Sequence, residues 1–97
     1  MNLMGANELF KKALLLLDRN DLVRGEQILR EVSNSTEPNR EMLYYEACGC
    51  LGELLVMTGR RDEAVPLLKQ VAALETENLF DDLLDYQMQR ARRLLAP

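Results

Sequence analysis

Apolar residues recur along the first part of the chain at the spacing of an amphipathic helix. Between residues 6 and 18 they lie at Leu9, Phe10, Ala13, Leu14, Leu16 and Leu17. These positions share one stripe of a 3.6-residue repeat, which predicts a helix over this range. Leu15 makes the last turn apolar almost all round, so we expect this helix to be covered on more than one side.

The same pattern predicts four further helices, at about residues 22–32, 39–58, 61–75 and 79–95. Asn20 or Asp21 is expected to cap the second helix, since both side chains accept hydrogen bonds from free amides at a helix start. Pro38 suits the first turn of the third helix. Pro66 lies about one turn into the fourth, where a proline costs least. Without any strand pattern, the fold is predicted to be all-α.

The chain also carries an internal repeat with an offset of 39 positions. Residues 20–29 align with residues 59–68, so that Gly25 matches Ala64. The other matches are Ala13 with Gly52, Leu16 with Leu55, Leu29 with Leu68 and Val32 with Val71. Two similar helical hairpins are therefore expected.

Residues 45–78, YEACGCLGELLVMTGRRDEAVPLLKQVAALETEN, resemble one 34-residue tetratricopeptide repeat. Gly52 stands where a hydrogen side chain lets a second helix approach closely. Gly59 stands where the first helix must stop, and glycine tolerates the left-handed backbone that a helix end commonly needs. Ala64 is the next small residue at the helix crossing. The apolar stripe then continues with Leu68 and Val71.

The resemblance implies a right-handed helical repeat within one domain that spans residues 1–97. It implies two helix-turn-helix units, at about 6–39 and 45–78, and a C-terminal capping helix at about 79–95. The first unit fits the family less closely, with Asn20 in a turn where the family often has glycine.

Other positions depart from the family pattern. Cys48 replaces a bulky aromatic residue, and Thr76 replaces the usual proline. Asp82 and Asp85 occupy positions that would be apolar in a third unit, so the last helix is expected to cap the stack.

Composition narrows the functional classes. The net charge is −4, which argues against nucleic-acid binding as the main function. No apolar run reaches the roughly 18 residues that a membrane span needs. The N-terminal residues 1–12 do not resemble a secretory signal, and two cysteines without an export signal indicate a reducing compartment. The sequence therefore predicts a cytoplasmic protein without nucleic-acid or membrane partners.

The chain has no histidine, which removes the commonest general base and the commonest transition-metal ligand. The thiols of Cys48 and Cys50 would point about 200° apart on a helix, so no zinc or redox pair is expected. The first turn of the last helix has three acidic residues, Asp81, Asp82 and Asp85, and its end has three basic ones, Arg90, Arg92 and Arg93. Both clusters are expected to be solvated helix ends that complement the helix dipole. We predict no enzyme activity, no metal and no cofactor.

In the family that the chain resembles, the first helix of each hairpin lines a concave groove. By resemblance, the groove-facing residues are Asn7, Phe10, Leu14, Leu17, Gly49, Glu53 and Val56. Phe10, Leu14 and Leu17 would receive an amphipathic partner helix. They would equally suit a contact with a second copy of the chain, or an internal core under the last helix. The sequence leaves these three alternatives open.

The predicted function is a non-catalytic interaction module that binds a partner helix or peptide through an apolar groove, as an adaptor or a chaperone-like protein. Small acidic bacterial export chaperones of similar shape offer an analogy. The alternative is a self-associating structural or regulatory subunit, a homodimer formed through the apolar helix faces.

Overall fold

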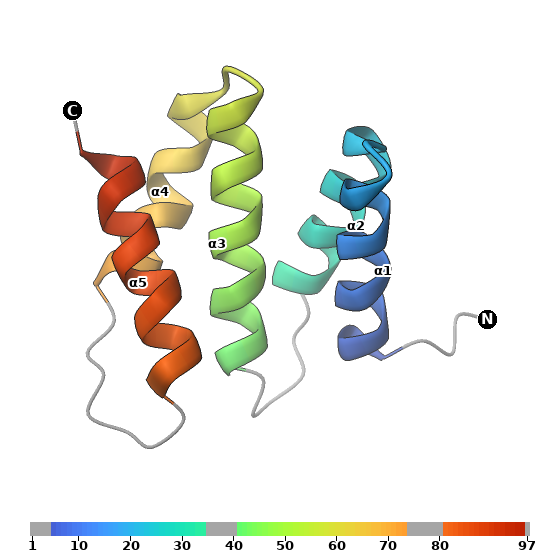
Figure 1. Ribbon diagram of the computed structural model, residues 1–97, viewed down its shortest axis with the longest axis horizontal. Coiled ribbons are helices and arrows are strands. Elements are labelled where there is room, and N and C mark those ends of the chain that lie inside the picture. Colours follow the sequence, from blue (N-terminus) through green and yellow to red (C-terminus); the bar gives the residue numbers. More distant parts are fainter. Residues whose placement is uncertain (1–4, 35–40, 74–80, 97) are drawn as a thin grey trace.

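The computed structural model describes residues 5–34, 41–73 and 81–96, and it is helical throughout these ranges except at the turns. Its five helices are α1 (Ala6–Asp18), α2 (Leu22–Ser33), α3 (Glu41–Met57), α4 (Arg61–Ala72) and α5 (Asp81–Leu95) (Figure 1). The all-α prediction is confirmed for the described residues. The expected starts of the third and fifth helices and the expected end of the fourth lie outside them.

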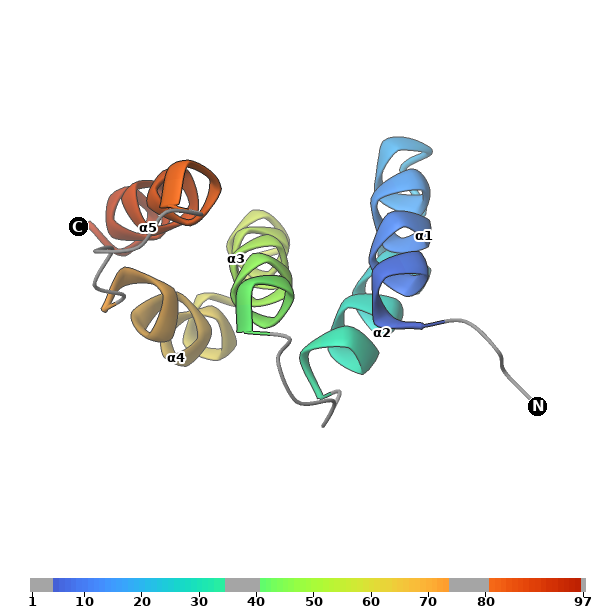
Figure 2. The same ribbon diagram turned by 90° about the horizontal axis from the view of Figure 1, so that it is seen from below.

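The helices form two layers. Each one packs against its neighbour in sequence, and α5 also packs against α3. Figure 2 shows α1, α3 and α5 on one side of the molecule and α2 and α4 on the other. The Cα radius of gyration is 13.0 Å, the value of a compact domain of about 100 residues.

The two hairpin turns have the same backbone conformation, 39 positions apart. Asn20 has φ of 63° and Gly59 has φ of 79°. After α1, the Asp21 amide donates to the Leu16 carbonyl at 2.8 Å. After α3, the Arg60 amide donates to the Leu55 carbonyl at 2.7 Å. The expected left-handed conformation of Gly59 is confirmed, and Asn20 provides the same conformation in the first hairpin.

Small residues lie where the helices of each hairpin cross. Gly52 is buried so closely against Leu68 that a Cβ there would lie 2.6 Å from Leu68 Cδ2. Gly25 faces Leu17 in the same way, because a Cβ on Gly25 would lie 2.5 Å from Leu17 Cδ2. The repeat-matched residues at these crossings are fully buried, namely Ala13, Leu29, Val32, Ala64, Leu68 and Val71. The two hairpins are thus alike at these turns and buried positions, whereas in the matched pair Leu16 and Leu55 only Leu55 is fully buried.

The second helix is capped as expected, because the Asp21 side chain accepts a hydrogen bond from the Arg24 amide. Within the described ranges, no helix has the length and apolar character that crossing a membrane would require. The division of the chain into two repeat units and a capping helix stays a prediction.

Candidate protein-interaction face

The three helices on one side of the molecule, α1, α3 and α5, run in the same direction and expose what we call the α1–α3–α5 face (Figures 1 and 2). α5 packs against α3, α1 contacts α3 only slightly, and α1 and α5 do not touch within the described ranges. All seven residues predicted to face a groove lie on these helices, four on α1 and three on α3. Some of them are exposed and others are covered.

The α1 residues separate into exposed and buried ones. Asn7 is exposed and Leu14 is 39% exposed. Phe10 is 9% exposed and belongs to the hydrophobic core, and Leu17 is half-buried against Gly25. Of the three apolar residues expected to receive a partner, only Leu14 lies at the surface.

The α3 residues lie beside α5. Gly49 is buried, and a Cβ on it would overlap the Gln87 side chain. Glu53 forms an ion pair with Arg90, and Val56 is half-buried. The last helix therefore covers Gly49 and pairs with Glu53, and it does not pack against α1 among the described residues.

Arg90 holds an exposed aromatic side chain in place. Its Nη1 donates to the Tyr86 hydroxyl at 2.8 Å, and its guanidinium carbon lies 5.8 Å from the centroid of the same ring. The ion pair with Glu53 fixes the other side of the guanidinium. Tyr86 remains 51% exposed. The sequence reasoning placed Arg90 in a solvated helix end and did not single out Tyr86.

A second stripe of α3 is formed by Glu46, Cys50, Glu53 and Met57, which have the helical spacing i, i+4, i+7 and i+11; Met57 is exposed and the other three are half-buried. Met57 is 70% exposed. Burial raises the pKa of the Cys50 thiol to about 11, with Glu53 and Glu46 adding to the shift. Burial also raises the pKa of the Glu46 carboxyl. The spacing of this stripe was available in the sequence, but the family pattern favoured its neighbours Gly49 and Val56.

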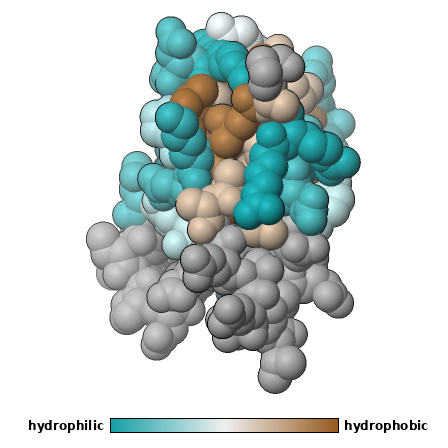
Figure 3. Space-filling model, turned by 90° about the vertical axis from the view of Figure 1, so that its left-hand side faces the viewer, coloured by the Kyte–Doolittle hydropathy of each residue, from teal (hydrophilic) through white to brown (hydrophobic). Residues whose placement is uncertain are grey.

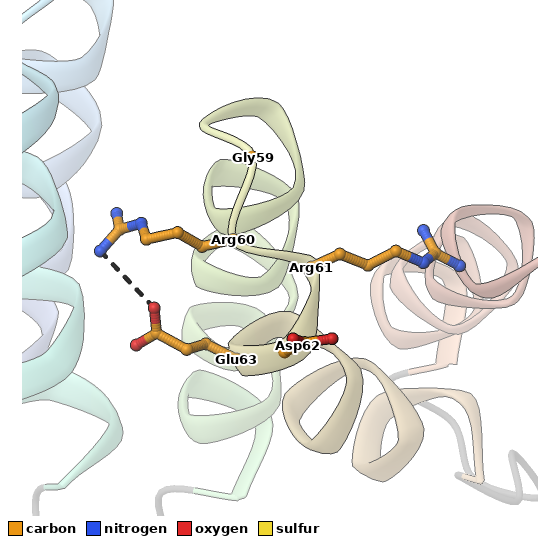
Figure 4. Close-up of a pocket in the computed structure, with 5 residues that line it drawn as sticks. All are labelled: Gly59, Arg60, Arg61, Asp62 and Glu63. Atoms are coloured by element: carbon orange, nitrogen blue, oxygen red, sulfur yellow. Dashed lines mark ion pairs between the residues drawn. The ribbon is translucent and has the colours of Figure 1, made fainter.

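Arginines at the turn between α3 and α4 contact both the last helix and the first hairpin. The turn forms a shallow pocket lined by residues 59–63, and Figure 4 shows Arg60 and Arg61 pointing in opposite directions from it. Arg61 donates to the carbonyl oxygens of Leu94 and Leu95 at 2.9 and 3.1 Å. In return, Arg92 donates to the Ala72 carbonyl at 3.2 Å. These arginines satisfy carbonyls at the ends of α5 and α4, which the helices themselves leave free.

Arg60 points the other way, toward the first hairpin, and belongs to a group of four charged side chains that we call the Glu26 network. The Glu26 carboxylate accepts hydrogen bonds from both Nη atoms of Arg60 and, at 3.1 Å, from Arg30 Nε. Arg30 Nη2 also donates to Glu63 Oε1 at 3.3 Å. Arg60 Nη1 lies 3.9 Å from Glu63 Oε2 (Figure 4). The Arg60 hydrogen bond and, less strongly, Arg30 hold the pKa of Glu26 below its usual value, against the opposing effect of burial.

The end of the molecule formed by α4 and α5 shows a narrow apolar strip between hydrophilic side chains (Figure 3). The half-buried apolar residues of these two helices are Val65, Leu67, Ala72, Leu94 and Leu95. Hydrophilic atoms border the strip on both sides, so it is a seam between two helices rather than a broad patch.

Within the described residues, no three Cys, Asp or Glu side chains gather as they would around a metal ion. A comparison with known proteins finds no matching family model, no similar curated protein and no similar solved structure. The functional argument therefore depends on the geometry of the chain itself.

Proposed function

We propose that this chain is a non-catalytic interaction module that binds a helix or peptide of another protein on the α1–α3–α5 face. In this proposal its two hairpins stack as tetratricopeptide-like units, and α5 caps the stack. The repeated turns at Asn20 and Gly59 and the matched crossings at Gly25 and Gly52 support the repeat. The parallel course of α1, α3 and α5 supports a shared face.

The observation that carries the proposal is the exposure of Leu14 on the part of α1 that α5 leaves uncovered. Exposed side chains on the neighbouring helices, Met57 and Tyr86, add apolar and aromatic area. Tyrosine and arginine are enriched among residues that dominate binding energy, and Arg90 is already fixed beside Tyr86. An adaptor or chaperone-like role in the bacterial cytoplasm is part of this proposal.

The second candidate is a homodimer formed through apolar helix faces. Leu15 and Val23 favour it, because they are 58% and 70% exposed and neither was expected to face the groove. Large apolar side chains at the surface of a small protein often mark a contact.

Two neighbouring residues of α1 provide the test. Leu14→Asp places a charge on the α1–α3–α5 face, and Leu15→Asp places the same charge on another side of the same helix. A photoreactive amino acid is placed at position 14 or at position 15 in the producing cell. The proposal expects cross-linking to one different protein from position 14 and not from position 15. It also expects purified protein to have the 11.1 kDa mass of one chain by light scattering.

Two results would contradict the binding face. A wild-type dimer that Leu14→Asp or Leu15→Asp converts to a folded monomer would favour the homodimer instead. A Leu14→Asp variant without helical circular dichroism would show that Leu14 belongs to the core.

A further inference from the structure

The first hairpin, α1 and α2, is attached to the rest of the molecule along one helix contact. α2 packs along α3, whereas α1 contacts α3 only slightly. Among the described residues, α2 and α4 do not pack against each other, and neither do α1 and α5. Packed helices can rotate and slide by small amounts against one another. A hairpin held mainly along one helix contact can therefore change its angle by a small amount about that contact.

The Glu26 network restrains this angle. Glu26 and Arg30 lie on α2, Arg60 lies in the turn before α4, and Glu63 lies in the first turn of α4. Their side chains span two helices whose backbones do not pack together. The Glu26 side chain is only 17% exposed, which shields its charge from water more than that of a typical surface pair.

The network lies on the opposite side of the α2–α3 contact from α1. Figure 2 shows α2 and α4 in one layer, and α1 with α3 and α5 in the other. A pull on α2 toward α4 therefore turns the first hairpin so that α1 moves away from α3 and α5. Without that pull, α1 is free to approach them.

We infer that the Glu26 network is a latch that sets the angle of the first hairpin and holds the α1–α3–α5 face open. Only the regulatory role of the latch, control of access to the proposed binding face, rests on the proposed function. The latch itself is a property of the isolated chain and needs no partner to be measured.

The distance between α1 and α5 reports the state of the latch. Spin labels are attached to cysteines introduced at the exposed positions Lys12 and Gln89. The background carries Cys48→Ala and Cys50→Ser, so that no other thiol is labelled. The label-to-label distance is measured by pulsed electron paramagnetic resonance. We expect Glu26→Gln to broaden the distance distribution and shift it to shorter values.

Two further variants make the result specific. Glu31→Gln removes the same charge from an exposed position of α2 that forms no ion pair in the described residues, and it should leave the distribution unchanged. Arg60→Gln removes the other member of the central pair and should shift the distribution as Glu26→Gln does. An unchanged distribution in Glu26→Gln overturns the latch, and so does an equal shift in Glu31→Gln.

A salt titration of the labelled protein with the native network avoids any effect of substitution on folding. Raising the sodium chloride concentration to about 1 M shortens the screening length to about 3 Å. Arg30 and Arg60 are 41% and 39% exposed, so salt reaches these pairs. We expect the same shift to shorter distance while helical circular dichroism is retained. A constant distance across the titration overturns the latch, whatever the cross-linking at position 14 shows.

Discussion

Replacing Gly52 by alanine tests the close approach of α3 and α4. A Cβ on Gly52 would lie 2.6 Å from Leu68 Cδ2 and 2.8 Å from Leu68 Cγ. Leu68 is 1% exposed, so its side chain has no solvent to move into. Overpacking of this kind costs about 1–3 kcal/mol. Alanine recovers about 1 kcal/mol of helix propensity relative to glycine. We therefore expect a net loss of about 1 kcal/mol in the free energy of unfolding.

Gly49→Ala is the matched control, because Gly49 lies on the same helix and gains the same propensity. Its Cβ would meet the amide end of Gln87, which is half-buried and able to move. We expect this variant to be as stable as wild type or more stable by up to about 1 kcal/mol. The two substitutions should thus differ by about 1–3 kcal/mol, the cost of overpacking alone.

Urea unfolding followed by circular dichroism measures both free energies, and thermal melting should agree. A change of 1 kcal/mol corresponds to about 4–8 °C in Tm for a domain of this size. Equal stability of Gly52→Ala and Gly49→Ala would refute the reasoning, because the Leu68 side chain would then have moved aside with no loss of folding free energy.

Two further predictions concern the turn and the ion network. Asn20→Val should lower the free energy of unfolding by about 1–2 kcal/mol, because a β-branched residue must adopt φ near 63°, whereas Asn20→Gly should not lower it. Thermal melts of the two variants check this, and equal melting would contradict it. The pKa of Glu26 is lowered in the folded chain, so its ionised carboxylate stabilises the fold above its ordinary pKa of 4.5. This stability is lost as the pH falls through the lowered pKa of the folded state. Arg30 and Arg60 stay charged over this range, and Glu63 lies beside the same two arginines. Urea midpoints measured from neutral to acid pH should therefore fall less steeply for Glu26→Gln than for wild type, and parallel curves would exclude the effect.

The helices were predictable because their signals are local. The stripe from Leu9 to Leu17 and the breaks at residues 19–21 fix α1 at Ala6–Asp18, the range predicted. Gly59 and Asn20 mark both turns because few residues tolerate a left-handed backbone.

The Glu26 network was not predictable from the sequence pattern. Glu26 and Arg60 are separated by 34 positions, and neither belongs to a motif that pairs them. Their contact depends on how the first hairpin lies against α3, which helical periodicity does not encode. A pattern of 3.6 residues gives the buried side of each helix but not the neighbour that covers it.

The candidate face shows the same limit. Periodicity grouped Phe10, Leu14 and Leu17 as one apolar set, but the core takes Phe10 and leaves Leu14 at the surface. The edge of a buried stripe is decided by the position of the next helix, here α3, and not by the stripe itself.

The place of α5 changes which residues a partner could meet. Gln87 and Arg90 cover Gly49 and Glu53, the α3 positions that the family resemblance assigned to a groove. A partner helix on the proposed face would therefore contact Leu14 on α1 and reach α3 at Met57, which is exposed at the end of that helix. The width available to that helix depends on the separation of α1 from α5. Since those two helices do not touch in the described residues, the separation is set by the α2–α3 contact and by the charges that bridge α2 to the α4 turn.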